Sequence, residues 1–254
     1  MVVYFFNLLE KIFLFINSYN MKTHYTFDSL GGEDHGWLNA KHHFSFANYY
    51  DPNKMSFGEL LVINDDRIAP NTGFGSHPHD NMEIITFVRK GAISHEDSKG
   101  NKGQTTVGNV QVMSAGTGIM HSEHNHEDEE TNIYQIWIKP KSRDIEPKWA
   151  SAEFPTESTK DKLKLLVSGN NDAPLQIHQD ARIYTGTFKN QTKLNHIIKG
   201  QAYLLVSKGD IKIDDIKASK GDGIAIKDEN EITLECHANT EIILIEVPGE
   251  VEAR

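Results

Sequence analysis

The sequence predicts an all-β protein built from two antiparallel barrels in tandem. Short runs rich in β-branched and aromatic residues recur along the chain and are separated by turns that contain glycine and asparagine. After residue 20 there is no long stretch with the apolar period that a helix requires. The second half weakly repeats the layout of the first, with turns at Gly209-Asp210 and Gly221-Asp222. This pattern is typical of tandem β domains of related architecture.

Composition limits the classes of protein and partner. The 254 residues are 38% hydrophobic and 24% charged, which is typical of a globular protein of one large domain or two ordinary ones. The net charge of −10 and pI of about 5.7 argue against direct binding to nucleic acid or to anionic lipid, so neither is expected as a partner. The single cysteine, Cys236, excludes an intramolecular disulfide and indicates a cytoplasmic location.

Residues 1–20 differ from the rest of the chain. They are strongly apolar, but Glu10 and Lys11 interrupt the run, so it is a poor membrane span. No positive charge precedes the apolar part, as a secretory signal would require. We interpret 1–20 as an N-terminal extension, either a start-site over-extension or a dispensable tail. The alternative is an amphipathic helix that packs on the body.

The remaining chain divides into a first domain, a linker and a second domain. Residues 21–140 contain strand candidates at 42–50, 57–63 and 133–139. Residues 141–162 are polar, contain Pro147 and Pro155, and are predicted to be a linker. Strand-like runs return over 163–254. That second domain has isolated histidines and no His-x-His pair, so we expect it to lack a metal site.

Two short phrases of the first domain predict a metal site. Side chains two residues apart on a strand point the same way, so His77 and His79 share one face, as do His121 and Glu123. If the two strands are neighbours, three imidazoles and one carboxylate converge. That set suits a divalent transition metal and leaves coordination positions open. By the same alternation Glu83 also points inward.

Other histidines are given different interpretations. His124 faces away from His121, and with His126 it leads into an acidic run, so we expect both in a solvated loop. His42 and His43 are expected to be structural, or one of them to line the mouth of the pocket. His95, beside the predicted turn at 98–103, is expected to be exposed or hydrogen-bonded.

The motifs resemble those of the cupin superfamily. His77, His79, Glu83 and Gly91 match the first cupin motif, with seven residues in place of six before the glycine. The second motif is matched less well, because Ser114 replaces proline and four residues rather than two precede His121. The phrases at 34–52, 62–87 and 110–125 are similar to signature phrases of the pirin family. These departures from the general cupin motifs therefore point to the pirin branch of the superfamily.

The resemblance to pirins implies a fold, a ligand set and a metal. It implies a bicupin, two jelly-roll-like cupin domains in tandem, with one mononuclear centre in the first domain. The implied ligands are His77, His79, His121 and Glu123, and Glu83 becomes a pocket or second-sphere residue. One divalent transition metal ion is expected, with Fe²⁺ as the leading candidate and Mn²⁺, Ni²⁺, Co²⁺, Cu²⁺ or Zn²⁺ as alternatives.

The resemblance also implies an activity. It is strongest to bacterial pirin-like proteins with quercetin 2,3-dioxygenase activity, which implies oxidative ring opening of a flavonol or related enediol with O₂. Glu123 would act as the general base. An alternative is a metal-dependent redox sensor that acts through a protein partner. A further alternative is a bicupin without catalytic activity.

Overall fold

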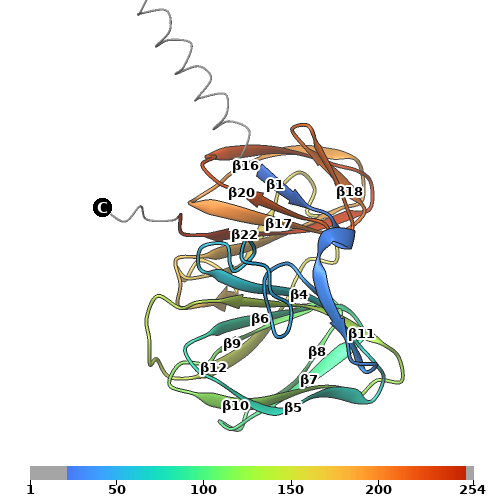
Figure 1. Ribbon diagram of the computed structural model, residues 1–254. Helices are drawn as coiled ribbons and strands as arrows, with labels where there is room; N and C mark the ends of the chain where they lie inside the picture. The colour runs from blue at the N-terminus through green and yellow to red at the C-terminus, as the bar shows by residue number, and fades with distance from the viewer. Residues whose placement is uncertain (1–21, 250–254) are drawn as a thin grey trace, which may run out of the picture.

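The described part of the chain, residues 22–249, is almost entirely β-structure in this computed structural model (Figure 1). Within these residues the helical content is one 3-10 turn, η1 (Phe27–Ser29). Four sheets form two domains stacked one on the other. The predicted all-β fold with tandem cupin domains is therefore confirmed. The expectation of barrels is corrected, because each domain consists of two separate sheets that do not close through hydrogen bonds.

The first domain pairs a seven-stranded sheet with a four-stranded sheet. The larger sheet has the order β12-β9-β6-β11-β4-β3-β2, with β2 (Gly31–Asp34), β3 (Leu38–His42), β4 (Leu60–Ile68), β6 (Glu83–Lys90), β9 (Asn109–Ser114), β11 (Thr131–Ile138) and β12 (Lys148–Glu153). The smaller sheet has the order β5-β10-β7-β8, with β5 (Thr72–His79), β7 (Ala92–Asp97), β8 (Lys102–Thr106) and β10 (Ile119–Asn125).

The second domain has the same arrangement of a seven-stranded and a four-stranded sheet. The larger sheet has the order β1-β20-β17-β22-β15-β13-β14, with β1 (Lys22–Tyr25), β13 (Lys164–Ser168), β14 (Leu175–Gln176), β15 (Arg182–Phe188), β17 (Gln201–Lys208), β20 (Gly223–Ile226) and β22 (Thr240–Val247). The smaller sheet has the order β16-β21-β18-β19, with β16 (Thr192–Ile197), β18 (Asp210–Ile213), β19 (Ile216–Ser219) and β21 (Glu231–Cys236).

Two strands belong to sheets that the sequence did not indicate. Strand β1 pairs with β20, so it lies in the large sheet of the second domain (Figure 1). Strand β12 pairs with β9 of the first domain, although it lies in the stretch expected to be a linker. The boundaries 21–140, 141–162 and 163–254 stay a prediction. The extension at 1–20 lies outside the described residues.

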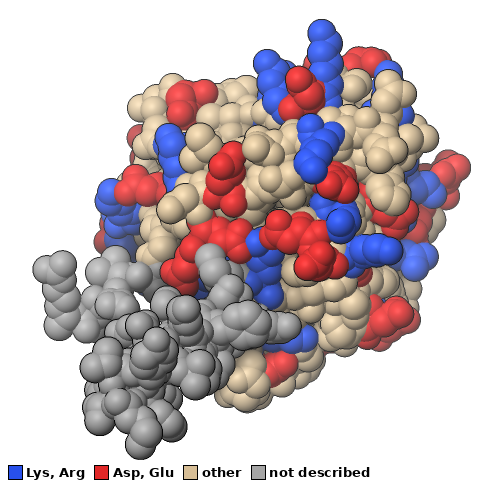
Figure 2. Space-filling view, turned by 90° about the horizontal axis from the view of Figure 1, so that it is seen from above, with Lys and Arg blue, Asp and Glu red and all other residues tan. Residues whose placement is uncertain are grey.

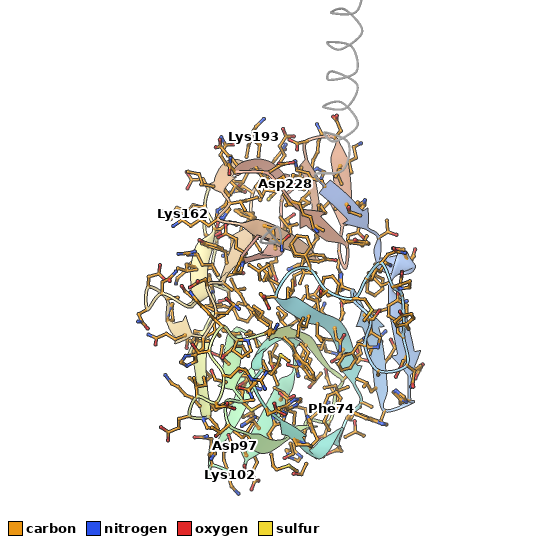
Figure 3. All side chains as sticks on the ribbon, turned by 60° about the vertical axis from the view of Figure 1, so that its left-hand side comes forward. Phe74, Asp97, Lys102, Lys162, Lys193 and Asp228 are labelled. Carbon is orange, nitrogen blue, oxygen red and sulfur yellow. The ribbon has the colours of Figure 1, made fainter. Side chains whose placement is uncertain are left out.

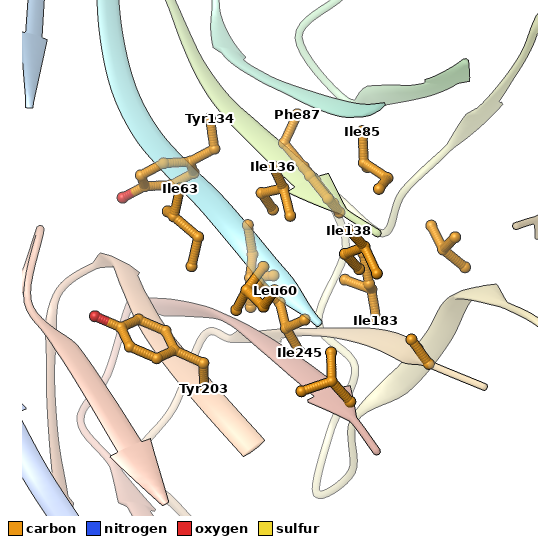
Figure 4. Close-up of a cluster of buried hydrophobic side chains, with 14 of the residues drawn as sticks. Leu60, Ile63, Ile85, Phe87, Tyr134, Ile136, Ile138, Ile183, Tyr203 and Ile245 are labelled. Carbon is orange, nitrogen blue, oxygen red and sulfur yellow. The ribbon is translucent and has the colours of Figure 1, made fainter. Parts of the chain in front are cut away.

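The largest hydrophobic core lies between the two large sheets. Leu60, Ile85 and Ile136 of the first domain pack in one cluster with Ile183 and Ile245 of the second (Figure 4). Because side chains alternate along a strand, the other face of the first domain's large sheet is free to cover its small sheet. The site described below lies between these two sheets, with its histidines on the small sheet and further pocket residues on the large one.

The aromatic stretch at 42–50 is mostly a loop, which corrects the predicted strand. Strand β3 ends at His42, and the chain then turns through a bridge between Phe46 and Tyr49. Ala47 within this turn has a φ of 50°, in the left-handed region, which ends any regular alternation. The loop brings Phe46 to the pocket of the first domain.

The surface of the described residues carries charges of both signs. On the face shown in Figure 2, Lys and Arg side chains are interspersed with Asp and Glu rather than gathered in one region. Within residues 22–249, no helix has the length and apolar character needed to cross a membrane.

Candidate metal centre

Three of the predicted ligands converge at the paired strands β5 and β10. These strands are antiparallel neighbours, with His77 opposite His121 and His79 opposite Ile119. One nitrogen from each of His77, His79 and His121 lies within 4.8 Å of the other two. The spacing of two residues and the strand pairing together explain this cluster.

Hydrogen bonding fixes which nitrogen of His77 is free. Its Nδ1 lies 2.7 Å from the carbonyl oxygen of Gly75. A carbonyl oxygen can only accept, so Nδ1 must carry the proton. In the neutral ring Nε2 therefore presents a lone pair.

A buried relay fixes His121 in the same way. Asp97 accepts from His95 Nε2 at 2.9 Å, so the proton of a neutral His95 is on Nε2 and its Nδ1 is an acceptor. That Nδ1 lies 3.4 Å from His121 Nδ1, which must then be the donor. Trp149 stacks on His95 with ring centroids 5.2 Å apart, which holds the relay in place. His121 Nε2 is consequently left with a lone pair.

The two free nitrogens face each other. His77 Nε2 and His121 Nε2 lie 3.0 Å apart. Two lone pairs at this distance repel unless a cation or a proton lies close to both. Burial, with a smaller contribution from the neighbouring imidazoles, lowers the pKa of His121 to about 3 and that of His79 to about 4, so both rings are neutral at pH 7. Neutral imidazoles are ligands for divalent transition metals, and this donor set fits one.

Glu123 lies beside His121 within a network of amide donors. Gln135 donates to one carboxylate oxygen at 2.8 Å, and Gln111 donates to the other at 2.8 Å. Burial raises the pKa of Glu123 to about 7, against the opposing effect of these hydrogen bonds. Glu123 clusters within 4.8 Å with His121 and His95, and not in the group that contains His77 and His79.

The pairing of β10 with β5 is irregular next to Glu123. The register shifts between His121 and Glu123, and Glu123 pairs with Phe74. This bulge changes how the carboxylate is presented relative to the imidazoles. Phe74, the partner of Glu123 in this pairing, and Asp97, the partner of His121 on β7, both lie in the first domain (Figure 3).

Glu83 lies away from this cluster. Its carboxylate accepts from Ser114 Oγ at 2.6 Å, and it does not line the pocket that contains the histidines. The reason is a break in the alternation, because β5 ends at His79 and Asn81 has a φ of 44°. Strand β6 then begins in the other sheet. Burial raises the pKa of Glu83 to about 7.

The three histidines open into a pocket of about 390 Å³. Its wall carries two aromatic pairs in edge-to-face contact, Trp37 with Phe74 at 5.2 Å and Phe46 with Trp137 at 5.4 Å between ring centroids. The sequence analysis assigned no role to these aromatics. They come from three separate stretches of the chain, so local spacing carried no signal for them.

The expectation of a solvated loop is wrong for His124 and fits His126. His124 lies half-buried on strand β10, where it pairs with Gly73 of β5, and His126 is exposed just after the strand ends. His124 and His126 stack with ring centroids 5.5 Å apart. Neither belongs to a group of potential metal ligands among residues 22–249. Both groups of that kind lie in the first domain, and the second domain's described residues contribute none.

Comparisons with known proteins extend over both domains. The family model described as Pirin matches residues 21–138, and the model described as the quercetinase C-terminal cupin domain matches residues 165–247. A pirin-like protein of Caulobacter vibrioides is 50% identical over 224 residues, which cover 87% of this chain and 97% of that protein. Quercetin 2,3-dioxygenase of Escherichia coli strain K12 is 42% identical over 221 residues, which cover 86% of this chain and 95% of that protein.

A solved structure shares the whole architecture. The crystal structure of the bacterial pirin YhhW from Escherichia coli, in complex with nickel(II), superposes with a TM-score of 0.85 at 40% identity. The match covers 91% of this chain and 100% of that chain.

Proposed function

The chain belongs to the pirin family of cupin proteins, and from this premise we propose that it is a metal-dependent dioxygenase. The proposed reaction is oxidative ring opening of a flavonol or related enediol with O₂, as the name quercetin 2,3-dioxygenase describes for the Escherichia coli relative. The observation that carries the proposal is the 3.0 Å approach of two imidazole lone pairs in an aromatic-walled pocket.

We assign the metal to His77, His79, His121 and Glu123. A bound divalent transition metal would supply Lewis acidity and redox chemistry at this position. Fe²⁺ is the leading candidate, with Mn²⁺, Ni²⁺, Co²⁺, Cu²⁺ and Zn²⁺ as alternatives. The support for the histidines is their cluster and, from a relative, the nickel(II) in the related pirin crystal. Glu123 is proposed as the fourth ligand from the resemblance to pirins and from its place beside His121.

Glu123 is the proposed general base. Burial raises the pKa of its carboxyl to about 7 when no metal is bound, so once it loosens from the metal it can accept a proton from a substrate hydroxyl near neutral pH and return it. Gln111 and Gln135 each donate to a different oxygen, which holds the carboxylate in one orientation while it exchanges the proton.

The aromatic wall is the proposed binding surface for the organic substrate. A pocket of about 390 Å³ is within the size range of small-molecule sites. Trp37, Phe74 and Trp137 offer flat apolar faces and edges, which favour a planar aromatic ligand and displace water from the reacting end.

The domain assignment follows from the same placement. We propose that residues 21–140 supply the catalytic cupin domain and that residues 163–254 supply a cupin domain without a metal site. Strand β12 adds to the first of these domains, and β1 adds to the sheet of the second. Cys236, in that second domain, is buried and unpaired. This thiol fits the reducing cytoplasm in which we propose that the protein acts.

One assay tests the proposed activity. The purified protein is stripped of metal, loaded separately with each of the candidate ions, and mixed with quercetin under air. We expect the visible absorbance of quercetin to fall, with O₂ consumed and carbon monoxide released in equal amounts. The His121→Ala variant should be inactive, and His124→Ala, on the same strand, should be active. Absence of turnover with every ion would reject the dioxygenase.

A further inference from the structure

The pocket wall contains polar side chains that the metal proposal does not use. His42 lies on β3 opposite Asn64 on β4, and Asp66 follows two residues further along β4. Asn64 and Asp66 therefore point to the same side of the sheet, and all three residues line the pocket. The intervening Asp65 points to the other side, where it pairs with Arg89.

His42 presents a hydrogen-bond acceptor to this pocket. Its Nδ1 lies 2.8 Å from the side-chain oxygen of Asn64, which can only accept, so Nδ1 is the donor. Burial lowers the pKa of His42, which keeps the ring neutral. The remaining Nε2 is thus a lone pair, and it is buried without a partner among the described residues.

Asp66 presents a second unpaired atom. The residue is 2% exposed, and its Oδ1 has no hydrogen-bond partner among the described residues. Burial, followed by the charges of Asp65 and Glu123, raises the pKa of Asp66 to about 8. In its protonated form the carboxyl can donate to a ligand oxygen, and in either form it can accept from a hydroxyl.

Two buried polar atoms without partners, in residues that line a largely aromatic pocket, are unfavourable unless a ligand that enters beside them pairs with them. A hydroxyl group satisfies both requirements, because it donates to a lone pair and also accepts. The pocket thus joins an aromatic wall, three imidazoles and a buried polar patch. This combination of groups is complementary to a planar aromatic compound that carries hydroxyl groups away from its reacting end.

We propose that His42 and Asp66 form a hydroxyl-recognition subsite that selects polyhydroxylated aromatic ligands over analogues that lack those hydroxyls. The reacting end of the ligand would lie at the histidine cluster, and this part of the inference rests on the proposed function. Within the subsite, His42 Nε2 accepts one phenolic O–H, and Asp66 pairs with a neighbouring phenolic group. Both are specificity-determining residues in this account.

The test compares two flavonols that share the same reacting end. Quercetin carries several phenolic hydroxyls, and 3-hydroxyflavone keeps only the 3-hydroxyl. Dissociation constants are measured by quenching of tryptophan fluorescence, with both metal-loaded and metal-free protein, so that the result does not depend on turnover. We expect Asp66→Leu and His42→Phe each to weaken quercetin binding by about 10-fold to 100-fold. Binding of 3-hydroxyflavone should change less than about 3-fold.

His124→Ala is the matched control. It removes an imidazole of the same domain that does not line the pocket, so the ratio of the two dissociation constants should equal that of the wild type. Thermal melting and circular dichroism establish that each variant is folded. A variant that does not fold is replaced by Asp66→Ala or His42→Ala, which also remove the polar atoms, and the same selective loss is expected.

The outcomes separate this inference from the proposed activity. Selective loss of quercetin binding supports the subsite, and it does so even if the wild type turns over neither flavonol. Equal weakening of both ligands, or unchanged binding of both, overturns the subsite even if quercetin is consumed rapidly. Failure of the wild type to bind either flavonol also overturns it.

Discussion

His77 Nε2 and His121 Nε2 face each other at 3.0 Å, and hydrogen bonds hold a proton of each ring on its Nδ1. Gly75 fixes the first ring through its carbonyl oxygen, and the Asp97–His95 pair fixes the second. The chain therefore prepares two lone pairs at one point before any ligand arrives. Preorganised donors of this kind are what a tight metal site requires.

Loss of one imidazole should abolish tight metal binding. We expect His77→Ala to reduce the metal content after dialysis from about one ion per chain to below about a tenth, because too few neutral donors then remain. Elemental analysis of the dialysed protein measures this. His124→Ala is the control, since His124 stacks only on His126. Equal metal content in wild type and His77→Ala would contradict the assignment.

The hydrogen-bonded pair of Asp97 and His95 behind His121 should influence metal affinity, although Asp97 is not a proposed ligand. Asp97→Asn removes the charge that orients His95, so His121 loses its fixed tautomer, and metal affinity should fall by about 10-fold to 100-fold. Competition with a chelator measures the affinity. An asparagine can still accept from the backbone N–H groups of Lys99 and Asn101, so the turn should persist.

Glu96→Gln provides the control for the relay. Glu96 is the neighbour of Asp97, but it pairs with Lys102 at the surface. We expect its metal affinity to match that of the wild type. If Asp97→Asn and Glu96→Gln bind metal equally well, the relay has no part in holding His121.

Glu83 should make stability depend on pH. Its folded-state pKa of about 7 lies above the ordinary value of 4.5, so the folded chain holds more protons than the unfolded chain between these values. Its favourable contribution is complete below pH 4.5 and is lost as the pH rises to 7. The free energy of unfolding of Glu83→Gln should therefore rise relative to wild type by on the order of 3 kcal/mol between pH 4.5 and 8. Denaturant unfolding across this range measures the gain, and a constant difference would contradict it.

The aromatic wall should act on substrate binding more than on chemistry. Trp37 packs edge-to-face on Phe74 and belongs to neither group of potential metal ligands. We expect Trp37→Leu to raise KM for quercetin by about 10-fold while kcat changes little, because contact with the planar ring is lost. Tyr50→Leu, at a side chain that is 71% exposed, should leave both constants unchanged. The account would be contradicted if steady-state kinetics gave the same KM for Trp37→Leu and Tyr50→Leu.

Parts of the cluster were predictable because strand geometry is local. The two-residue spacing of His77 and His79 indicates a shared face, and only one further fact, the pairing of their strand with that of His121, was needed. That pairing was assumed in the sequence analysis and is observed in the structure. The resemblance of the surrounding phrases to pirins indicated the tandem cupin fold, which the structure confirms.

Other parts depend on contacts that no local pattern reports. Glu83 seemed to share the alternation of His77, but the turn at Asn81 moves the chain into another sheet. Strand β1 pairs with β20 of the second domain, which lies about 200 residues later in the sequence. No local pattern can reveal a pairing over that distance. The relay from Asp97 and the pocket positions of Trp37 and Asp66 likewise arise from long-range packing.

The extended X-ray absorption fine structure of the bound metal tests the central claim most directly, because multiple scattering from imidazole rings allows these ligands to be counted. The account predicts one ion per chain with three imidazoles, from His77, His79 and His121, and oxygen ligands that include Glu123. His95→Gln should keep this count. A spectrum with two imidazoles that loses one in His95→Gln would place the ion in the other group, formed by His95, His121 and Glu123, and would contradict the account.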